Sequence, residues 1–185
     1  MNRPPSSSLV LAAAAMLFAS VLVPPSSGRA DTMLGHDGAI HEPTDDVYLL
    51  LRLRERRLYL MRSADDDRPA RRLDSFPVAI GRKEFATPTG RFRVTEKIVD
   101  PAFLQFDWEN PARVTGRIDP GPDNPLGLRW IGFTTAYGWD IGFHGTPRPE
   151  LLGQAVSHGC VRMRNSDVVK LYGRIDVGTP VIVQP

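Results

Sequence analysis

The chain has 185 residues, the length of one globular domain and little more. Hydrophobic residues make up 42% and charged residues 24%, an ordinary composition that excludes a disordered tail protein, a collagen and a multi-span membrane protein. The formal net charge is +2, and the single cysteine excludes both an internal disulfide and a zinc site built from several cysteines. The 16 Gly and 17 Pro residues argue against a long helical bundle and favour a turn-rich β fold.

Residues 1–30 have the pattern of an export signal. Arg3 gives a short positive region, residues 9–23 form an uncharged apolar run, and Gly28-Arg29-Ala30 places small residues before a cut after Ala30. The apolar run is short for a membrane span, which needs about 20 residues. We therefore expect a cleaved signal and no membrane span in the mature protein, with a retained anchor as the alternative.

Removal of this signal also removes the excess positive charge. Arg3 and Arg29 are its only charged residues, so 21 of the 23 basic residues remain against 21 acidic ones. A neutral mature chain gives no support for a nucleic-acid partner. Residues 31–45 show no periodicity and are interpreted as a linker, which leaves residues 46–185 as the folded domain.

Short apolar or alternating runs separated by turn residues predict most of this domain as β-strands. The first two runs form an expected hairpin, whereas the proline-rich stretch 101–127 is expected to be a loop. Phe106 and Trp108 in that stretch belong either to a satellite core or to the wall of a groove. One helix is expected over 166–173, capped by Asn165 or Ser166. The predicted strands are 47–53, 57–61, 76–80, 92–94, 128–133, 137–143 and 181–183.

This pattern predicts a mainly β domain of the sandwich or small-barrel type, with one or two short helices. Its chemistry gathers around the only cysteine, Cys160, which follows Ser157-His158-Gly159 and lies sixteen residues after His144. A free thiol has a pKa of about 8.5, and a nearby imidazole activates it by taking its proton or by pairing with the thiolate. The preceding glycine allows backbone amides to face a reacting carbonyl oxygen.

If a strand starts at Cys160, its side chains alternate. Val161 and Met163 then face the core, while Cys160 and Arg162 share the other face, where the guanidinium group can hold a substrate carboxylate. Two plainer interpretations remain open from the residues alone. The cysteine is a small buried hydrophobe, or His144, His158 and Cys160 form a mononuclear metal site. His36 and His41 fall in the linker and are expected to be solvated.

Taken together, His144-Gly145-Thr146 and the later Ser157-His158-Gly159-Cys160 resemble the signature of the L,D-transpeptidase catalytic domain, also called YkuD-like. The resemblance covers about residues 46–185. Weaker matches are Ile80-Gly81, Thr87-Pro88-Thr89-Gly90, Asn124-Pro125-Leu126-Gly127, Asn165 with Asp167, Leu171-Tyr172 and Gly178-Thr179-Pro180-Val181.

The resemblance implies a sandwich-like β fold and an exported enzyme that acts on peptidoglycan in the periplasm or cell wall. Cys160 would attack the carbonyl between residues three and four of a stem tetrapeptide and pass the acyl group to an amine, which gives a 3→3 crosslink. His144 would transfer the proton. Arg162 and Thr146 would contact substrate, and the site would be shaped by Ser157, His158, Gly159 and Gly145, with the amides around Gly159 and Cys160 as the oxyanion hole. No cofactor or metal is implied, and a monomer is expected.

Three rival functions remain at this point. An L,D-carboxypeptidase, or an enzyme that attaches a protein to peptidoglycan, would use the same first half-reaction with a different acceptor. A sortase also places His before Cys and Arg after it, but the Ser-His-Gly-Cys sequence argues against it. A wall-binding protein without catalysis would be expected to lack Cys160, His144 or Arg162. Residues 31–45 are too short for a separate wall-binding module, so any anchoring must come from the catalytic domain or a partner.

Overall fold

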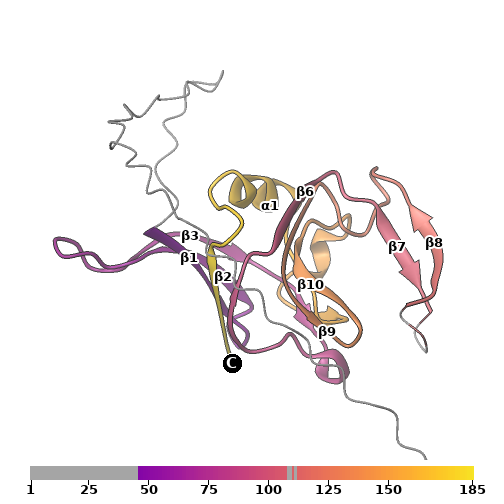
Figure 1. Ribbon diagram of the computed structural model, residues 1–185, viewed down its shortest axis with the longest axis horizontal. Helices are drawn as coiled ribbons and strands as arrows, with labels where there is room; N and C mark the ends of the chain where they lie inside the picture. The colour runs from indigo at the N-terminus through magenta and orange to yellow at the C-terminus, as the bar shows by residue number, and fades with distance from the viewer. Residues whose placement is uncertain (1–45, 108–109, 111) are drawn as a thin grey trace, which may run out of the picture. The chain divides into compact units, whose positions relative to one another are not determined.

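The computed structural model describes residues 46–107, 110 and 112–185. The predicted signal (1–30), the predicted linker (31–45) and Trp108 lie outside the described residues. Within them the fold is mainly β with one α-helix (Figure 1), which confirms the predicted class. No helix in this described part is long and apolar enough to cross a membrane.

A five-stranded sheet in the order β3-β2-β1-β13-β5 forms one half of the domain. Its first two strands make the predicted antiparallel hairpin, and the C-terminal strand β13 lies parallel to β1. Leu49 and Leu51 alternate toward the core and pair with Leu60 and Leu58, as a half-buried strand requires. The strands are β1 (Val47–Arg52), β2 (Arg57–Arg62), β3 (Arg71–Pro77), β5 (Gly90–Arg93) and β13 (Pro180–Gln184).

A four-stranded sheet in the order β12-β10-β9-β6 carries the residues of the Cys-His motif. β9 and β10 are joined by Tyr137 and Gly138, which both have positive φ as a tight two-residue hairpin turn requires. β12 runs parallel to β10 and pairs His144 with Arg162. These strands are β6 (Glu96–Val99), β9 (Arg129–Ala136), β10 (Trp139–His144) and β12 (Val161–Arg162).

Two small sheets complete the pairing. β4 (Ile80–Gly81) and β11 (Ala155–Ser157) run parallel, whereas β7 (Phe103–Phe106) and β8 (Val114–Ile118) form an antiparallel hairpin that projects beside β9 and β10 (Figure 1). Two short 3-10 helices, η2 (Lys83–Phe85) and η3 (Pro149–Leu151), lie in the connecting loops.

One hydrophobic core joins the two larger sheets. Helix α1 (Asn165–Tyr172) packs against β9 and β10 and buries Val168 and Leu171. The five-stranded sheet contributes leucines, and the four-stranded sheet contributes Ile131, Phe133 and Phe143. Because the strands that carry the Cys-His motif have one face in this core, the positions of the side chains on their other face are fixed by packing.

The predicted strand at 76–80 is wrong in extent. β3 begins earlier, at Arg71, and ends at Pro77, which has no N–H to donate to a sheet. The chain then changes partners: Val78 N–H donates to Arg56 O, and Ala79 pairs with Arg162. Only after this switch does β4 begin beside β11.

Two further predictions are wrong. The stretch 101–127 is not all loop, because the residues that flank its prolines pair with each other as β7 and β8. Helix α1 begins one residue early, with Arg164 at the N-cap and no side-chain cap. Asn165 does not cap the helix because its amide is used elsewhere: Oδ1 accepts from Leu128 N, and Nδ2 donates to Thr146 O.

Candidate functional site

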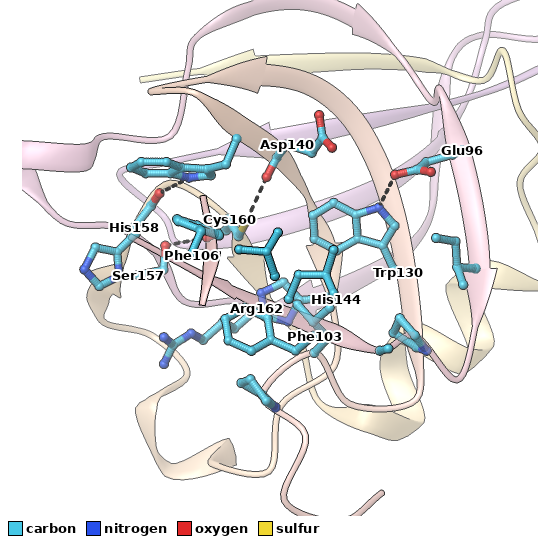
Figure 2. A pocket seen from close by; sticks show the side chains of 18 of the residues that line it. Glu96, Phe103, Phe106, Trp130, Asp140, His144, Ser157, His158, Cys160 and Arg162 are labelled. Carbon is cyan, nitrogen blue, oxygen red and sulfur yellow. Dashed lines mark hydrogen bonds between the residues drawn. The ribbon is translucent and has the colours of Figure 1, made fainter. Parts of the chain in front are cut away.

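A groove of about 470 Å³ lies between the four-stranded sheet and the β7–β8 hairpin (Figure 2). Its wall on the hairpin side is apolar and includes Phe106, which stacks on Trp139 at 5.5 Å between ring centroids. Phe106 therefore lies in the wall of a groove, one of its two predicted places. The predicted site residues that line the groove are His144, Ser157, His158, Cys160 and Arg162.

The loop before Cys160 is held in a single turn by Ser157. Its Oγ donates to the carbonyl oxygen of Cys160 at 2.5 Å and accepts from the amide of Gly159 at 3.1 Å. Gly159 has φ +110, a conformation that favours glycine, and a Cβ there would lie 2.8 Å from the Ile141 side chain. From outside the loop, the buried Thr87 hydroxyl donates to Gly159 O and accepts from Gly81 N.

The turn affects the two backbone amides predicted to form the oxyanion hole, those of Gly159 and Cys160. The Gly159 amide is engaged by Ser157, so Gly159 shapes the loop through its conformation. The Cys160 amide, in contrast, donates no hydrogen bond to any of the described residues. Within this loop, the Cys160 N–H is therefore the group that can donate a hydrogen bond to a developing oxyanion.

Cys160 lines the groove and is partly buried. Its Sγ donates to the carbonyl oxygen of Asp140 at 3.6 Å. Burial raises the pKa of the thiol to about 11, against the smaller lowering effects of the Gly142 amide and the Arg162 charge. The thiol is therefore protonated at neutral pH.

His144 ends β10 and is 5% exposed. Its Nδ1 lies 2.6 Å from the carbonyl oxygen of Gly145, and because a carbonyl only accepts, Nδ1 carries the proton and Nε2 is the basic nitrogen. Burial lowers the pKa of His144 to about 4, although hydrogen bonding to the Gly145 carbonyl opposes this shift. The imidazole is therefore neutral at pH 7.

The resting pair is thus a thiol and a neutral imidazole rather than a thiolate–imidazolium pair. Of the two ways of activating the thiol that the sequence left open, this state fits proton transfer to His144 during attack. Figure 2 shows Cys160, His144 and Arg162 among the side chains that line the groove.

Arg162 places a cation next to the thiol. The alternation predicted for this segment holds, since Val161 and Met163 are fully buried and Arg162 faces the groove with Cys160. Burial lowers the pKa of Arg162, and no described carboxylate forms an ion pair with it. A half-buried guanidinium group without a counter-ion is suited to bind a carboxylate ligand.

The remaining three predicted residues lie at the edge of the site or outside the groove. His158 contacts Phe85 at 5.1 Å between ring centroids, and its ring points away from Cys160 (Figure 2). Gly145 supplies the carbonyl that orients His144. Thr146 is buried, does not line the groove, and its Oγ1 accepts from Arg148 N in a local turn, so its substrate contact stays a prediction.

Several residues that support the site were quoted from the sequence without a role. Buried Asn124 donates from Nδ2 to Pro101 O and accepts at Oδ1 from Leu126 N, which fixes the loop that brings Pro125 and Leu126 into the groove. Asn165 ties α1 to the loop that follows His144. Trp130, which the motif search missed, stacks on His144 with ring centroids 6.0 Å apart.

A second cavity of about 510 Å³ lies on the other side of His158 and Trp139, lined also by Arg82, Phe85 and Tyr137. Among the described residues, no three His, Cys, Asp or Glu side chains are grouped so that they could hold a metal ion. The groove itself is lined by a thiol, an imidazole and a guanidinium group, from Cys160, His144 and Arg162.

Comparison with known proteins gives a family for this domain. The family model for the L,D-transpeptidase catalytic domain matches residues 46–183. The putative L,D-transpeptidase YqjB of Bacillus subtilis is 43% identical over 111 residues, which cover 58% of this chain and 57% of that protein. The putative L,D-transpeptidase YkuD of Bacillus licheniformis is 30% identical over 115 residues, which cover 62% of this chain and 55% of that protein. The chain thus spans little more than half the length of these relatives.

Solved structures support the fold. L,D-transpeptidase 3 from Mycobacterium tuberculosis, in complex with a faropenem-derived adduct, matches with a TM-score of 0.55 and 21% identity. The match covers 76% of this chain and 60% of that one. At this level of identity the likeness concerns the arrangement of the strands.

Proposed function

This chain belongs to the L,D-transpeptidase catalytic domain family, and from this we propose that it is an exported cysteine L,D-transpeptidase of peptidoglycan stem tetrapeptides. The observation that carries the proposal is the convergence of Cys160, His144 and Arg162 on one groove. A nucleophile, a base with a defined tautomer and an unpaired cation are the groups that acyl transfer from a carboxylate-bearing peptide requires.

In the first half-reaction His144 Nε2 takes the thiol proton as Cys160 Sγ attacks the carbonyl carbon between residues three and four of the donor stem. The Cys160 amide faces the oxyanion, and Arg162 binds a carboxylate of the stem. The C–N bond then breaks, and the imidazolium returns its proton to the leaving amine of the terminal D-amino acid. A thioester on Cys160 remains.

In the second half-reaction an amine of a neighbouring stem attacks the thioester. His144 accepts a proton from that amine and delivers it to the departing sulfur, which restores the thiol. The product is a 3→3 crosslink and the enzyme is unchanged. Water in place of the amine would give a tripeptide by the same steps, so carboxypeptidase activity differs only in the acceptor.

The proposed location is outside the cytoplasmic membrane, in the periplasm or cell wall. Two features support it: the signal pattern of residues 1–30 and the peptidoglycan substrate proposed for the groove. The single cysteine has no disulfide partner in the chain, and its pKa of about 11 leaves little thiolate to be oxidised in such a compartment.

The proposal is tested with purified protein and a disaccharide-tetrapeptide, with the products identified by mass spectrometry. We expect 3→3 dimers and release of the terminal D-amino acid. Cys160→Ala should abolish both, and His144→Ala should lower the rate by roughly 10²–10⁴. Tripeptide alone would reassign the enzyme as an L,D-carboxypeptidase.

A covalent probe tests the nucleophile independently of the acceptor. A carbapenem should add its mass to the wild-type protein and leave Cys160→Ala unmodified, while circular dichroism shows that the variant is folded. No adduct on the wild-type protein, together with no turnover of tetrapeptide, would favour a wall-binding protein without catalysis.

A further inference from the structure

We propose that Glu96 is a positioning residue for His144 and acts through Trp130, whose indole it holds against the imidazole. The inference rests on the proposed role of His144 as the base. It is carried by two contacts that join residues on three neighbouring strands. Neither contact depends on a residue of the Cys-His motif other than His144 itself.

The contacts form a continuous chain across the four-stranded sheet. Glu96 Oε1 on β6 accepts a hydrogen bond of 2.7 Å from Trp130 Nε1 on β9. The indole of Trp130 then stacks on the ring of His144 on β10, with centroids 6.0 Å apart and the planes at 26°. Figure 2 shows these side chains in order, from the Glu96 carboxylate through the Trp130 indole to His144.

Strand register explains why these side chains meet. Trp130 lies directly opposite His144 on one side and Ile98 on the other, so all three occupy the groove face of the sheet. Glu96 lies opposite Gly132, two residues further along the same face. The indole therefore has to lean over Gly132 to reach the carboxylate.

Two glycines leave the space for this arrangement. A Cβ on Gly142 would lie 2.9 Å from the Trp130 ring, and a Cβ on Gly132 would lie 2.9 Å from Glu96 Cγ and 3.2 Å from Trp130 Nε1. The neighbouring strands thus keep this row free of side chains at the positions that Trp130 and Glu96 fill. A Cβ on Gly142 would also lie 2.6 Å from Ile131 O, so Gly132 is the position whose open space serves the Glu96–Trp130 contact in particular.

The orientation of the indole matters because its Nε1 has a single hydrogen-bond function, as a donor. Trp130 is 7% exposed, so removal of the Glu96 acceptor leaves the N–H of a nearly buried ring without that partner. The ring would then turn to reach water and uncover His144. The one other ionisable group that acts on the pKa of the imidazole is Arg162, whose positive charge lowers it.

A direct role for Glu96 is the competing explanation, because Glu96 is exposed and also lines the groove, where its carboxylate could bind a substrate amine. The two explanations differ in one respect. If Glu96 acts through Trp130, it has no effect once the indole N–H is gone. If Glu96 binds substrate, its effect persists without the indole.

The test is a double-mutant cycle of Glu96→Ala and Trp130→Phe, measured by tetrapeptide turnover and by the rate of carbapenem acylation. We expect Glu96→Ala to lower kcat about tenfold with KM changed less than about threefold, and to have no further effect in the Trp130→Phe background. Glu96→Gln, which keeps an oxygen acceptor, should lose less than Glu96→Ala. Asp66→Ala, an exposed carboxylate in the turn between β2 and β3, is the control.

A second readout does not require activity. The imidazole pKa of His144, followed by NMR, should rise in Glu96→Ala and stay near the wild-type value in Glu96→Gln. An equal kcat loss from Glu96→Ala in both backgrounds, or an unchanged His144 titration, would overturn the inference. A wild-type protein that neither turns over tetrapeptide nor reacts with the carbapenem would instead overturn the proposed function, while the titration would still report on the Glu96–Trp130 contact.

Discussion

At the scale of single residues, Cys160 and His144 are both neutral at pH 7 and line the same groove. Burial sets the pKa of the thiol near 11 and that of the imidazole near 4, so between these values a proton must move during attack. Neutral forms of the two groups follow from their burial, because burial penalises the charged form of each group. The Gly145 carbonyl ensures that the available nitrogen of the base is Nε2.

This pairing predicts an unusual pH profile. The base is active when unprotonated, so kcat/KM should fall on the acid side only near pH 4 and stay flat from about pH 5 to 8. The measurement is the second-order rate of carbapenem acylation against pH, with tryptophan fluorescence recorded in parallel to exclude unfolding. An acid limb near 6.5, the ordinary value for histidine, would show that the imidazole is solvated in the working enzyme.

At the scale of elements, the site is fixed by side chains that bridge loops. Asn165 joins α1 to the segments before β9 and after β10, through Leu128 N and Thr146 O. The position of the Asn165 side chain also requires glycine at two neighbouring positions. A Cβ on Gly145 would lie 2.0 Å from Asn165 Oδ1, and a Cβ on Gly127 would lie 2.2 Å from the same atom. The helix thereby holds the loop whose carbonyl orients His144.

Asn165→Ala should therefore destabilise the protein by about 1–3 kcal/mol, because it leaves an amide and a carbonyl without their partner. Ser166→Ala is the matched control. Ser166 is the exposed neighbour, makes no cap, and should change stability by less than about 0.5 kcal/mol. Urea unfolding of the two variants decides the matter, and a larger loss from Ser166→Ala would restore the capping role predicted from sequence.

Sequence patterns were sufficient where the determinants are local. The β1–β2 hairpin follows from alternation and turn residues, and the Cys160–Arg162 relation follows from the period of a strand. The apolar residues 76–80 predicted a strand that continues past Pro77, but β3 ends at Pro77. The β7–β8 hairpin was missed because only pairing across the proline-rich segment reveals it.

The same distinction applies to the site. The Ser-His-Gly-Cys sequence and the upstream His-Gly-Thr predicted the candidate reacting groups, because the proposed chemistry depends on residue types in order. Glu96 and Trp130 could not be identified, since their relation to His144 depends on the register of β6, β9 and β10. Proximity in sequence to His144 does not place the Thr146 side chain in the groove, because that side chain is buried in a local turn.

At the scale of the whole molecule, the two larger sheets and α1 share one core, and His144 lies against it with 5% of its surface exposed. A mature chain from residue 31 would carry equal numbers of acidic and basic residues. General charge repulsion is therefore small near neutral pH. Specific buried groups, and not net charge, should control how the stability of the domain changes with mild acid.

His144 should make the free energy of unfolding decrease as the pH falls from about 6.5 to 4. Its pKa is about 4 in the folded state and about 6.5 when unfolded, so in this window the unfolded chain binds the extra proton. The full contribution is present above pH 6.5, and about 3 kcal/mol is lost by pH 4. Urea unfolding of wild type and His144→Gln from pH 4 to 8 measures this, since the difference between them isolates one imidazole from His158 and the carboxylates. Parallel curves for the two proteins would show that His144 ionises as freely in the folded state as in the unfolded one.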